Sequence, residues 1–217
     1  MGNIEDDREV LKELREIIKN KGNWGKIIDN VAFKLSEENS VTVKAKVLWL
    51  LGEIGLNYPV KVKKYVADIA NYLNDDCPKL RERSVNALGR IGRADKNLVM
   101  PYLDEIVEMR KDSIADVRLA FVWACENITT NAPELFCEKL NLFYEMIQDK
   151  SERVRIEAPE MFRVMGKRKP QYVEPYLEKL QWFADNDTHP VVRIHSVGAI
   201  RITKRALKER NSNATDD

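Results

Sequence analysis

The sequence has few of the residues from which metal sites and disulfides are built. Its 217 residues include two histidines and three cysteines, and Cys77, Cys125 and Cys137 show neither paired nor metal-type spacing. Zinc sites need ligands grouped at short, regular intervals. We therefore expect no metal, cofactor or disulfide, and we predict that the thiols are buried or turn residues in a reducing compartment.

An excess of one charge sign is missing, and so is any long apolar run. The chain carries 36 basic and 35 acidic residues, for a formal net charge of +1. A dedicated nucleic-acid binder usually shows a basic excess, so nucleic acid is a less favoured partner than protein. No stretch of about 18 apolar residues is present to span a membrane, and the acidic N-terminus lacks a secretory signal pattern. We expect a cytoplasmic protein with no membrane partner.

The sequence does contain a repeat. Pairs of an apolar and a basic residue recur at intervals of 37, 37, 37 and 38 residues: Val43-Lys44, Leu80-Arg81, Val117-Arg118, Val154-Arg155 and Val192-Arg193. An acidic or amide column precedes these pairs, with Asp75, Asp112, Asp149 and then Asn186 beside Asp187. Agreement of independent columns on one period is the signature of a repeat array.

Within each repeat the apolar residues recur at helical spacing. Val117, Phe121, Ala124, Cys125 and Ile128 lie at positions i, i+4, i+7, i+8 and i+11, which is typical of one buried stripe of an α-helix. No segment shows sustained two-residue alternation, so no β-sheet is expected. Short connections between the helices predict antiparallel hairpins.

The predicted fold is all-α, with eleven helices. A capping helix over residues 5–20 precedes five hairpins, which cover residues 21–57, 58–94, 95–131, 132–168 and 169–207. Residues 208–217 are predicted to form a polar, flexible tail. The predicted N-caps of second helices are Ser40, Asp76, Ser151 and Thr188. The glycines predicted to end second helices in the left-handed conformation are Gly55, Gly92 and Gly166.

The repeat resembles the HEAT-repeat family over about residues 21–207. The shared features are an aspartate in the turn and Val-Arg near the start of the second helix, as in Asp112 with Val117-Arg118, and prolines inside first helices, Pro101 and Pro175. The resemblance implies a right-handed α-solenoid whose column arginines form an internal ladder with the turn aspartates, although a ligand-binding role for these arginines stays open. It also implies a non-catalytic scaffold that binds a protein or peptide along a concave face lined by second helices.

A candidate groove follows from the helical angle of each position. Residues 3, 6 and 10 positions after the first residue of each pair lie on a stripe apart from the buried one. Trp49 and Trp123 share one of these offsets, two repeats apart, and exposed Trp and Arg are common interface anchors. The predicted partner-binding residues are Trp49, Arg83, Asn86, Arg90 and Trp123. The alternative is that both rings pack between neighbouring second helices, as core or inter-repeat residues, which is the expectation for Trp24 and Trp182.

Catalytic motifs are absent, because the sequence has no phosphate-binding loop, dinucleotide fingerprint, paired-histidine zinc motif or C-x-x-C. We therefore predict no catalytic residues. A weaker resemblance to HEAT-like alkyl-DNA glycosylases leaves open a DNA-binding or base-excising protein, with Trp49, Glu53 and Arg83 or Arg90 similar in type to the groove residues of those enzymes. A subunit that stacks on another protein through its apolar ends is a third possibility. The sequence leaves the identity of the partner and the oligomeric state open.

Overall fold

The computed structural model describes residues 4–36 and 38–213. All regular secondary structure in these two ranges is helical, and the short pieces of each first helix, counted together, give the eleven helical segments predicted. The chain divides into two compact units, Met1–Ala124 and Cys125–Asp217. The all-α fold class is therefore confirmed.

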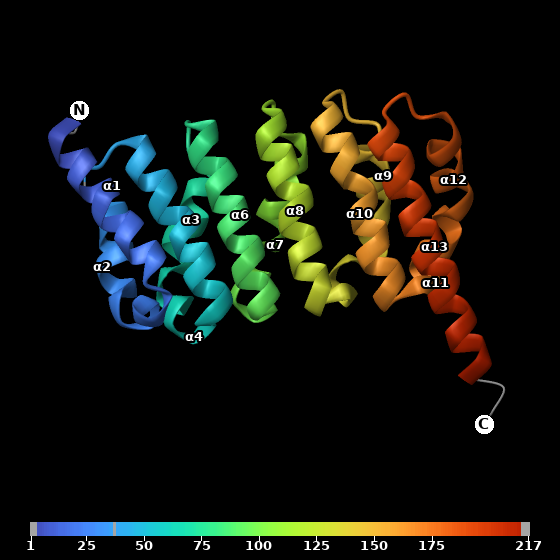
Figure 1. The fold of residues 1–217 in the computed structure, drawn as a ribbon, viewed down its shortest axis with the longest axis horizontal. Helices are drawn as coiled ribbons and strands as arrows, with labels where there is room; N and C mark the ends of the chain where they lie inside the picture. The colour runs from blue at the N-terminus through green and yellow to red at the C-terminus, as the bar shows by residue number, and fades with distance from the viewer. Residues whose placement is uncertain (1–3, 37, 214–217) are drawn as a thin grey trace. The chain divides into compact units, whose positions relative to one another are not determined.

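The first unit contains one single helix followed by helical hairpins (Figure 1). Its helices are α1 (Ile4–Lys19), α2 (Trp24–Ser36), α3 (Val41–Asn57), α4 (Pro59–Val62), α5 (Val66–Asn71), α6 (Pro78–Ala94), α7 (Leu103–Glu108) and the first part of α8 (Ala115–Asn131). Helix α3 packs along α6, and α1 and α2 both pack on α3. The predicted stripe supplies the core, since Val43, Val47 and Ile54 are fully buried.

The second unit contains the rest of α8 and two further hairpins. Its other helices are α9 (Leu140–Met146), α10 (Glu152–Arg168), α11 (Pro170–Val173), α12 (Leu177–Asn186) and α13 (Pro190–Asn213). Helices α10 and α13 lie side by side, and α12 packs on α13 (Figure 1). Phe143 and Phe162 are fully buried in this unit. None of the helices in the described ranges has the length and apolarity needed to cross a bilayer.

The first helices of the hairpins are interrupted by 3-10 turns. These turns cover Lys63–Tyr65 between α4 and α5, Met100–Tyr102 before α7, and Glu174–Tyr176 between α11 and α12. Pro101 and Pro175 lie in two of them, where proline removes a helical N–H donor. Lys64 holds the equivalent position one repeat before Pro101, so the interruption recurs with or without proline.

The turn inside each hairpin is held by its aspartate and by the arginine of the column pair. Asp75, Asp112, Asp149 and Asp187 each accept a hydrogen bond from the N–H two residues later, at 2.7–2.8 Å. Arg81, Arg118, Arg155 and Arg193 each donate to the backbone carbonyl of that aspartate, at 2.7–3.1 Å. These bonds satisfy buried backbone groups before each second helix begins, which supports a structural role for the arginine column.

Two of the four predicted N-cap residues do occupy the N-cap position. Ser40 accepts a hydrogen bond from the Val43 N–H, at 3.4 Å, and Ser151 is the N-cap of α10, although its side chain makes no capping bond. The other two predicted caps are wrong. Helix α6 begins after Cys77 rather than Asp76, and at the start of α13 His189 Nδ1 and not Thr188 accepts from a helical N–H.

The predicted glycine ends of the second helices are also wrong. No described glycine has a positive φ, and α3, α6 and α10 continue past Gly55, Gly92 and Gly166 by two residues each. Close packing explains glycine better, because a Cβ on Gly55 would lie 2.5 Å from Ile91 Cγ1. A Cβ on Gly52 would lie 2.7 Å from the Ala87 Cα on α6.

The predicted tail is helical over its described part. Helix α13 continues to Asn213, and residues 214–217 lie outside the described ranges. No glycine or proline occurs between residues 199 and 213 to end the helix. Arg205 pairs with Glu209 one turn later at 3.3 Å, and Arg210 donates to the Gln171 amide oxygen. The prediction of a flexible segment from residue 208 onward is therefore wrong as far as Asn213.

We expect Gly52→Ala to lower the free energy of unfolding by about 1–3 kcal/mol, because overpacking against the α6 backbone outweighs the better helix propensity of alanine. Urea denaturation followed by circular dichroism measures this change. Gly198→Ala is the matched control, since the nearest atom to its added Cβ lies 3.9 Å away. A stabilised Gly52→Ala variant would show that α3 and α6 can separate without cost.

The Arg81–Asp112 ion pair predicts a pH-dependent stability. Both guanidinium nitrogens Nε and Nη2 bind the carboxylate, at 2.7 and 3.1 Å. Burial alone would raise the pKa of Asp112, but the bonds from Arg81 and from the Ile114 N–H lower it below 3.8. The pair therefore stabilises the fold above the unfolded pKa, and this contribution is lost as pH falls through the lower folded pKa.

We expect Asp112→Asn to cost about 1–3 kcal/mol at neutral pH. Wild type and variant should converge in stability once the pH falls below the folded pKa of Asp112, where the carboxyl is protonated in both states. Chemical denaturation at a series of pH values tests this, with the exposed Asp104→Asn as control. An equal difference at all pH values would argue against the ion pair.

Candidate functional site

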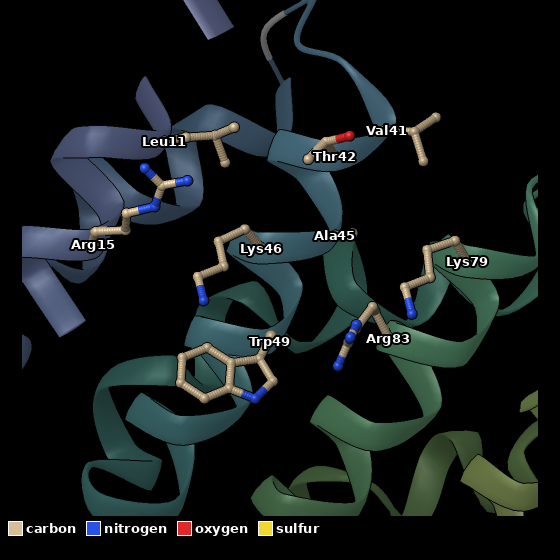
Figure 2. Close-up of a pocket in the computed structure, with 9 residues that line it drawn as sticks. All are labelled: Leu11, Arg15, Val41, Thr42, Ala45, Lys46, Trp49, Lys79 and Arg83. Atoms are coloured by element: carbon tan, nitrogen blue, oxygen red, sulfur yellow. The ribbon is translucent and has the colours of Figure 1, made fainter. Parts of the chain in front are cut away.

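A cavity of about 430 Å³ lies between α1, α3 and α6 of the first unit. We call it the α1–α3–α6 cavity. Its lining residues are Leu11, Arg15, Val41, Thr42, Ala45, Lys46, Trp49, Lys79 and Arg83 (Figure 2). Its size falls within the range of pockets that bind small molecules or a few side chains. Two of the five predicted site residues, Trp49 and Arg83, are thus brought together here.

Helix α1 is fixed in place by contacts that set one wall of this cavity. Trp24 is 2% exposed, and its indole N–H donates to the Ile17 carbonyl at 2.8 Å. Glu13 on α1 pairs with Lys34 on α2 at 2.9 Å. Leu14 is fully buried, so the next residue, Arg15, is directed away from the core. The expectation that Trp24 belongs to the core is confirmed.

Positive charge dominates the cavity. Four of its lining residues are cationic, Arg15, Lys46, Lys79 and Arg83, and none is acidic. Glu82 lies nearby on α6 and pairs with Lys79 at 2.6 Å, whereas its oxygen is 3.9 Å from the Arg83 Nε. One carboxylate therefore compensates only part of the charge. Figure 2 shows Lys46 and Arg83 extending toward the Trp49 ring, with Arg15 and Lys79 further away on either side.

Lys46 and Trp49 form the centre of the cavity. The Lys46 Nζ lies 4.5 Å from the centroid of the indole ring, which is a cation–π contact. Burial lowers the pKa of the Lys46 ammonium below its usual value, and the charges of Arg83 and Arg15 lower it further. Lys46 is thus held near two like charges, and a bound anion would relieve this repulsion.

The Trp49 ring is half-buried, unlike the fully enclosed Trp24. Its indole N–H has no hydrogen-bond acceptor within the described ranges, although buried indoles usually find one. One part of the ring therefore packs on the helices while the rest lines the cavity. This arrangement leaves a donor and an aromatic surface available to a ligand.

The remaining predicted site residues lie apart from this cavity. Asn86 is only 8% exposed, and its amide donates to the Glu82 carbonyl on its own helix at 3.1 Å. The prediction that Asn86 is exposed is therefore wrong. Arg90 pairs with Glu53 at 2.6 Å, so its charge is compensated. Trp123 is half-buried on α8 and does not line the cavity.

The sequence columns contain signals for the residues that the predicted site leaves out. Lys46 and Arg83 share one offset, 37 residues apart, and they meet in the cavity. Arg15 lies 37 residues before Gly52, so extending the columns into the capping helix places it beside α3. Lys79 comes just before the Leu80-Arg81 pair. It could not be found from the predicted stripe, which contains only positions 3, 6 and 10 after the first residue of each pair.

The second unit has a smaller basic cavity of about 250 Å³, lined by Thr130, Arg163, Val164, Lys167, Arg168, Ile202 and Arg205. Glu160 pairs with Arg163, and Glu209 pairs with Arg205 at 3.3 Å.

Trp182, expected in the core, is 59% exposed on α12, so that expectation is wrong. Among the described residues, no group of three His, Cys, Asp or Glu side chains is placed to hold a metal ion.

Comparison with known proteins identifies one family. Residues 8–193 match the model of a family described as sister chromatid cohesion protein PDS5. No curated protein sequence matches the chain. The match spans the repeats, and together with the fold it confirms the resemblance to HEAT-repeat proteins.

Designed armadillo repeat proteins are similar in structure. One, solved in complex with the peptide (KR)4, is 18% identical, with a TM-score of 0.64 over 88% of this chain and 86% of that one. Another, designed for modular peptide recognition, is 15% identical, with a TM-score of 0.61 and the same coverage. At these identities the likeness shows the fold alone, which is that of an armadillo- or HEAT-like repeat array.

Glu53 is the carboxylate that a HEAT-like DNA glycosylase would need for catalysis, and its ion pair with Arg90 lets us predict what its removal does to stability. Both side chains are about three-quarters buried, so Glu53→Gln leaves a partly buried guanidinium without its partner. We expect a loss of about 1 kcal/mol in unfolding free energy, measured by urea denaturation. Glu157→Gln, at the first offset of the stripe in the second unit, is the control.

The same variant separates the structural role from catalysis. A base-excising enzyme would release alkylated base from DNA, and Glu53→Gln would abolish that release. We expect no release from the wild-type protein. Release that disappears in a stably folded Glu53→Gln variant would overturn the structural interpretation of Glu53.

Proposed function

The chain belongs to the family of sister chromatid cohesion protein PDS5, and on this premise we propose that it is a non-catalytic scaffold that binds a segment of another protein. The binding site of the first unit is the α1–α3–α6 cavity, with Trp49 and Arg83 as its anchors. The observation that carries the proposal is the gathering of an unsatisfied indole and several cations in one open cavity. Tryptophan and arginine in such settings dominate the energetics of protein interfaces.

The site offers recognition groups without the parts of a catalytic centre. Its lining residues provide cationic donors, an indole N–H and apolar side chains, but no carboxylate, histidine or thiol. Carboxylates, histidines and thiols are, with lysine, the commonest general acid–base and nucleophilic groups. Glu53, the nearest carboxylate on the same helix face, is engaged with Arg90. The composition of the cavity therefore favours binding over chemistry.

A structural neighbour supports a peptide as the partner. The designed armadillo repeat protein with a TM-score of 0.64 was solved with the basic peptide (KR)4. A peptide bound to a helical repeat array meets side chains from successive repeats. Lys46 on α3 and Arg83 on α6 are such a pair of equivalent positions. The cytoplasmic location expected from the sequence stays a prediction.

Substitution of the anchors tests the proposal. Peptides would be selected from a random display library on the wild-type protein, and their affinities would be measured by fluorescence anisotropy. We expect Trp49→Ala and Arg83→Ala each to weaken the selected peptides about tenfold or more, as hot-spot truncations do. Trp182→Ala, which removes an exposed ring from the second unit, should leave the affinity unchanged.

The folded state of each variant would be checked by circular dichroism and thermal melting. Because Trp49 is half-buried, we expect the variant to fold with a modestly lower melting temperature. Unfolding of Trp49→Ala would assign the ring to the core. Peptides that bind equally well to wild type, Trp49→Ala and Arg83→Ala would contradict the proposed site.

A further inference from the structure

We propose that the occupant of the α1–α3–α6 cavity is an acidic peptide segment that carries an apolar side chain between its carboxylates. Arg15, Lys46 and Arg83 would bind the carboxylates, and the apolar side chain would pack against Trp49. This inference rests on the proposed function and names the chemistry of the partner. The arguments for it are the charge balance, the apolar wall and the limited extent of the positive surface.

The charge balance of the cavity favours an anionic ligand. Arg15 forms no ion pair within the described ranges, and Lys46 has only the cation–π contact with Trp49. Glu82 is committed to Lys79 at 2.6 Å and reaches Arg83 only at 3.9 Å. Three cations in one cavity therefore lack a close carboxylate. Carboxylates from a ligand would supply charge-assisted hydrogen bonds to guanidinium and ammonium donors.

The apolar wall favours an apolar side chain beside those carboxylates. Leu11 and Val41 line the cavity together with Ala45, and Val41 is 44% exposed on the first turn of α3. These groups and the Trp49 ring form a surface that a free inorganic anion would not use. Burial of an aliphatic or aromatic ligand side chain there contributes the hydrophobic part of the affinity. The indole N–H provides one further donor for a carboxylate or backbone carbonyl.

The limited extent of the positive surface favours a peptide over nucleic acid. Nucleic-acid binders carry a basic groove that follows many phosphates. The next cation along α6, Arg90, is compensated by Glu53 at 2.6 Å. The buried amide of Asn86 lies between Arg83 and Arg90 in the sequence and is bound to its own helix. Along α6, the uncompensated positive charge thus ends at the cavity of about 430 Å³.

A set of peptides that differ only in charge tests the inference on the full chain. Each fluorescein-labelled peptide of about 12 residues would hold one central Leu, flanked by Asp and Glu, by Asn and Gln, or by Lys, a length chosen to extend past one repeat. An oligo-thymidylate of equal charge is the nucleic-acid probe. We expect the acidic peptide to bind about tenfold tighter than the neutral one, and to weaken as salt rises from about 50 to about 300 mM.

Charge variants locate the binding. Lys46→Met keeps the length of the side chain and Arg83→Gln keeps a shorter polar one, and both remove a positive charge. Each should weaken the acidic peptide about tenfold while changing the neutral peptide little. Lys167→Gln is the control, because it removes an exposed cation from the basic cavity of the second unit. It should leave the affinity for the acidic peptide unchanged.

The outcomes separate the inference from the proposed function. Equal binding of acidic and neutral peptides that is lost in Trp49→Ala would overturn the inference and keep the proposed function. Tight binding of oligo-thymidylate with weak binding of the acidic peptide would also overturn the inference and identify nucleic acid as the ligand. Binding of the acidic peptide that Trp49→Ala, Lys46→Met and Arg83→Gln all leave unchanged would overturn both.

Discussion

The bond from each column arginine to the carbonyl of its turn aspartate fixes where a second helix begins. The aspartate side chain accepts from the N–H two residues further on, directly before the second helix, so polar backbone groups of the turn are hydrogen-bonded. In the first unit the arginine also reaches the next repeat, through the Arg81–Asp112 pair at 2.7 Å. Helices α3 and α6 pack along each other, so residues at equal offsets lie beside each other there, and Lys46 and Arg83 share one cavity.

Small residues between neighbouring second helices decide how much of each side chain remains accessible. Gly52 faces Ala87, and Gly89 faces Ala124, at distances that exclude an added Cβ. With helices this close, the stripe predicted to be exposed becomes half-buried, and a short side chain such as Asn86 is covered. Only long side chains extend beyond the contact, and the half-buried residues at these offsets on α3 and α6 are Lys46, Trp49, Glu53, Arg83 and Arg90.

The period of the sequence was sufficient to predict the helices, the hairpins and the stripe on which Trp49 and Arg83 lie at different offsets. The period also places Glu53 beside Arg90, 37 residues later, where the two form an ion pair. It could not predict that Arg15 and Lys46 have no carboxylate beside them within the described ranges. The role of glycine was misjudged for a related reason. A glycine near a helix end looks the same in the sequence whether it adopts a positive φ or lets another side chain pack closely against the helix. The position of Ile91 shows that Gly55 has the second role. Likewise, the composition near the C-terminus is polar, but the charged residues from Lys208 to Asn213 remain helical.

The location of the cavity follows from a departure from the small-residue rule. The column that contains Gly52 and Gly89 has Arg15 in the capping helix, and the facing column of Ala87 and Ala124 has Leu50 on α3. Between α1 and α3, these positions thus lack the small residues that admit the close approach of α3 and α6. The space that results is open to solvent on one side and receives cations from three helices. The net charge of +1 does not reveal this local excess of positive charge. Carboxylates pair with Arg81 and Arg90, whereas Arg15 and Lys46 have no carboxylate partner within the described ranges. The proposed binding site of the first unit thus lies where the repeat pattern is broken, and the regular repeats position the side chains around that break.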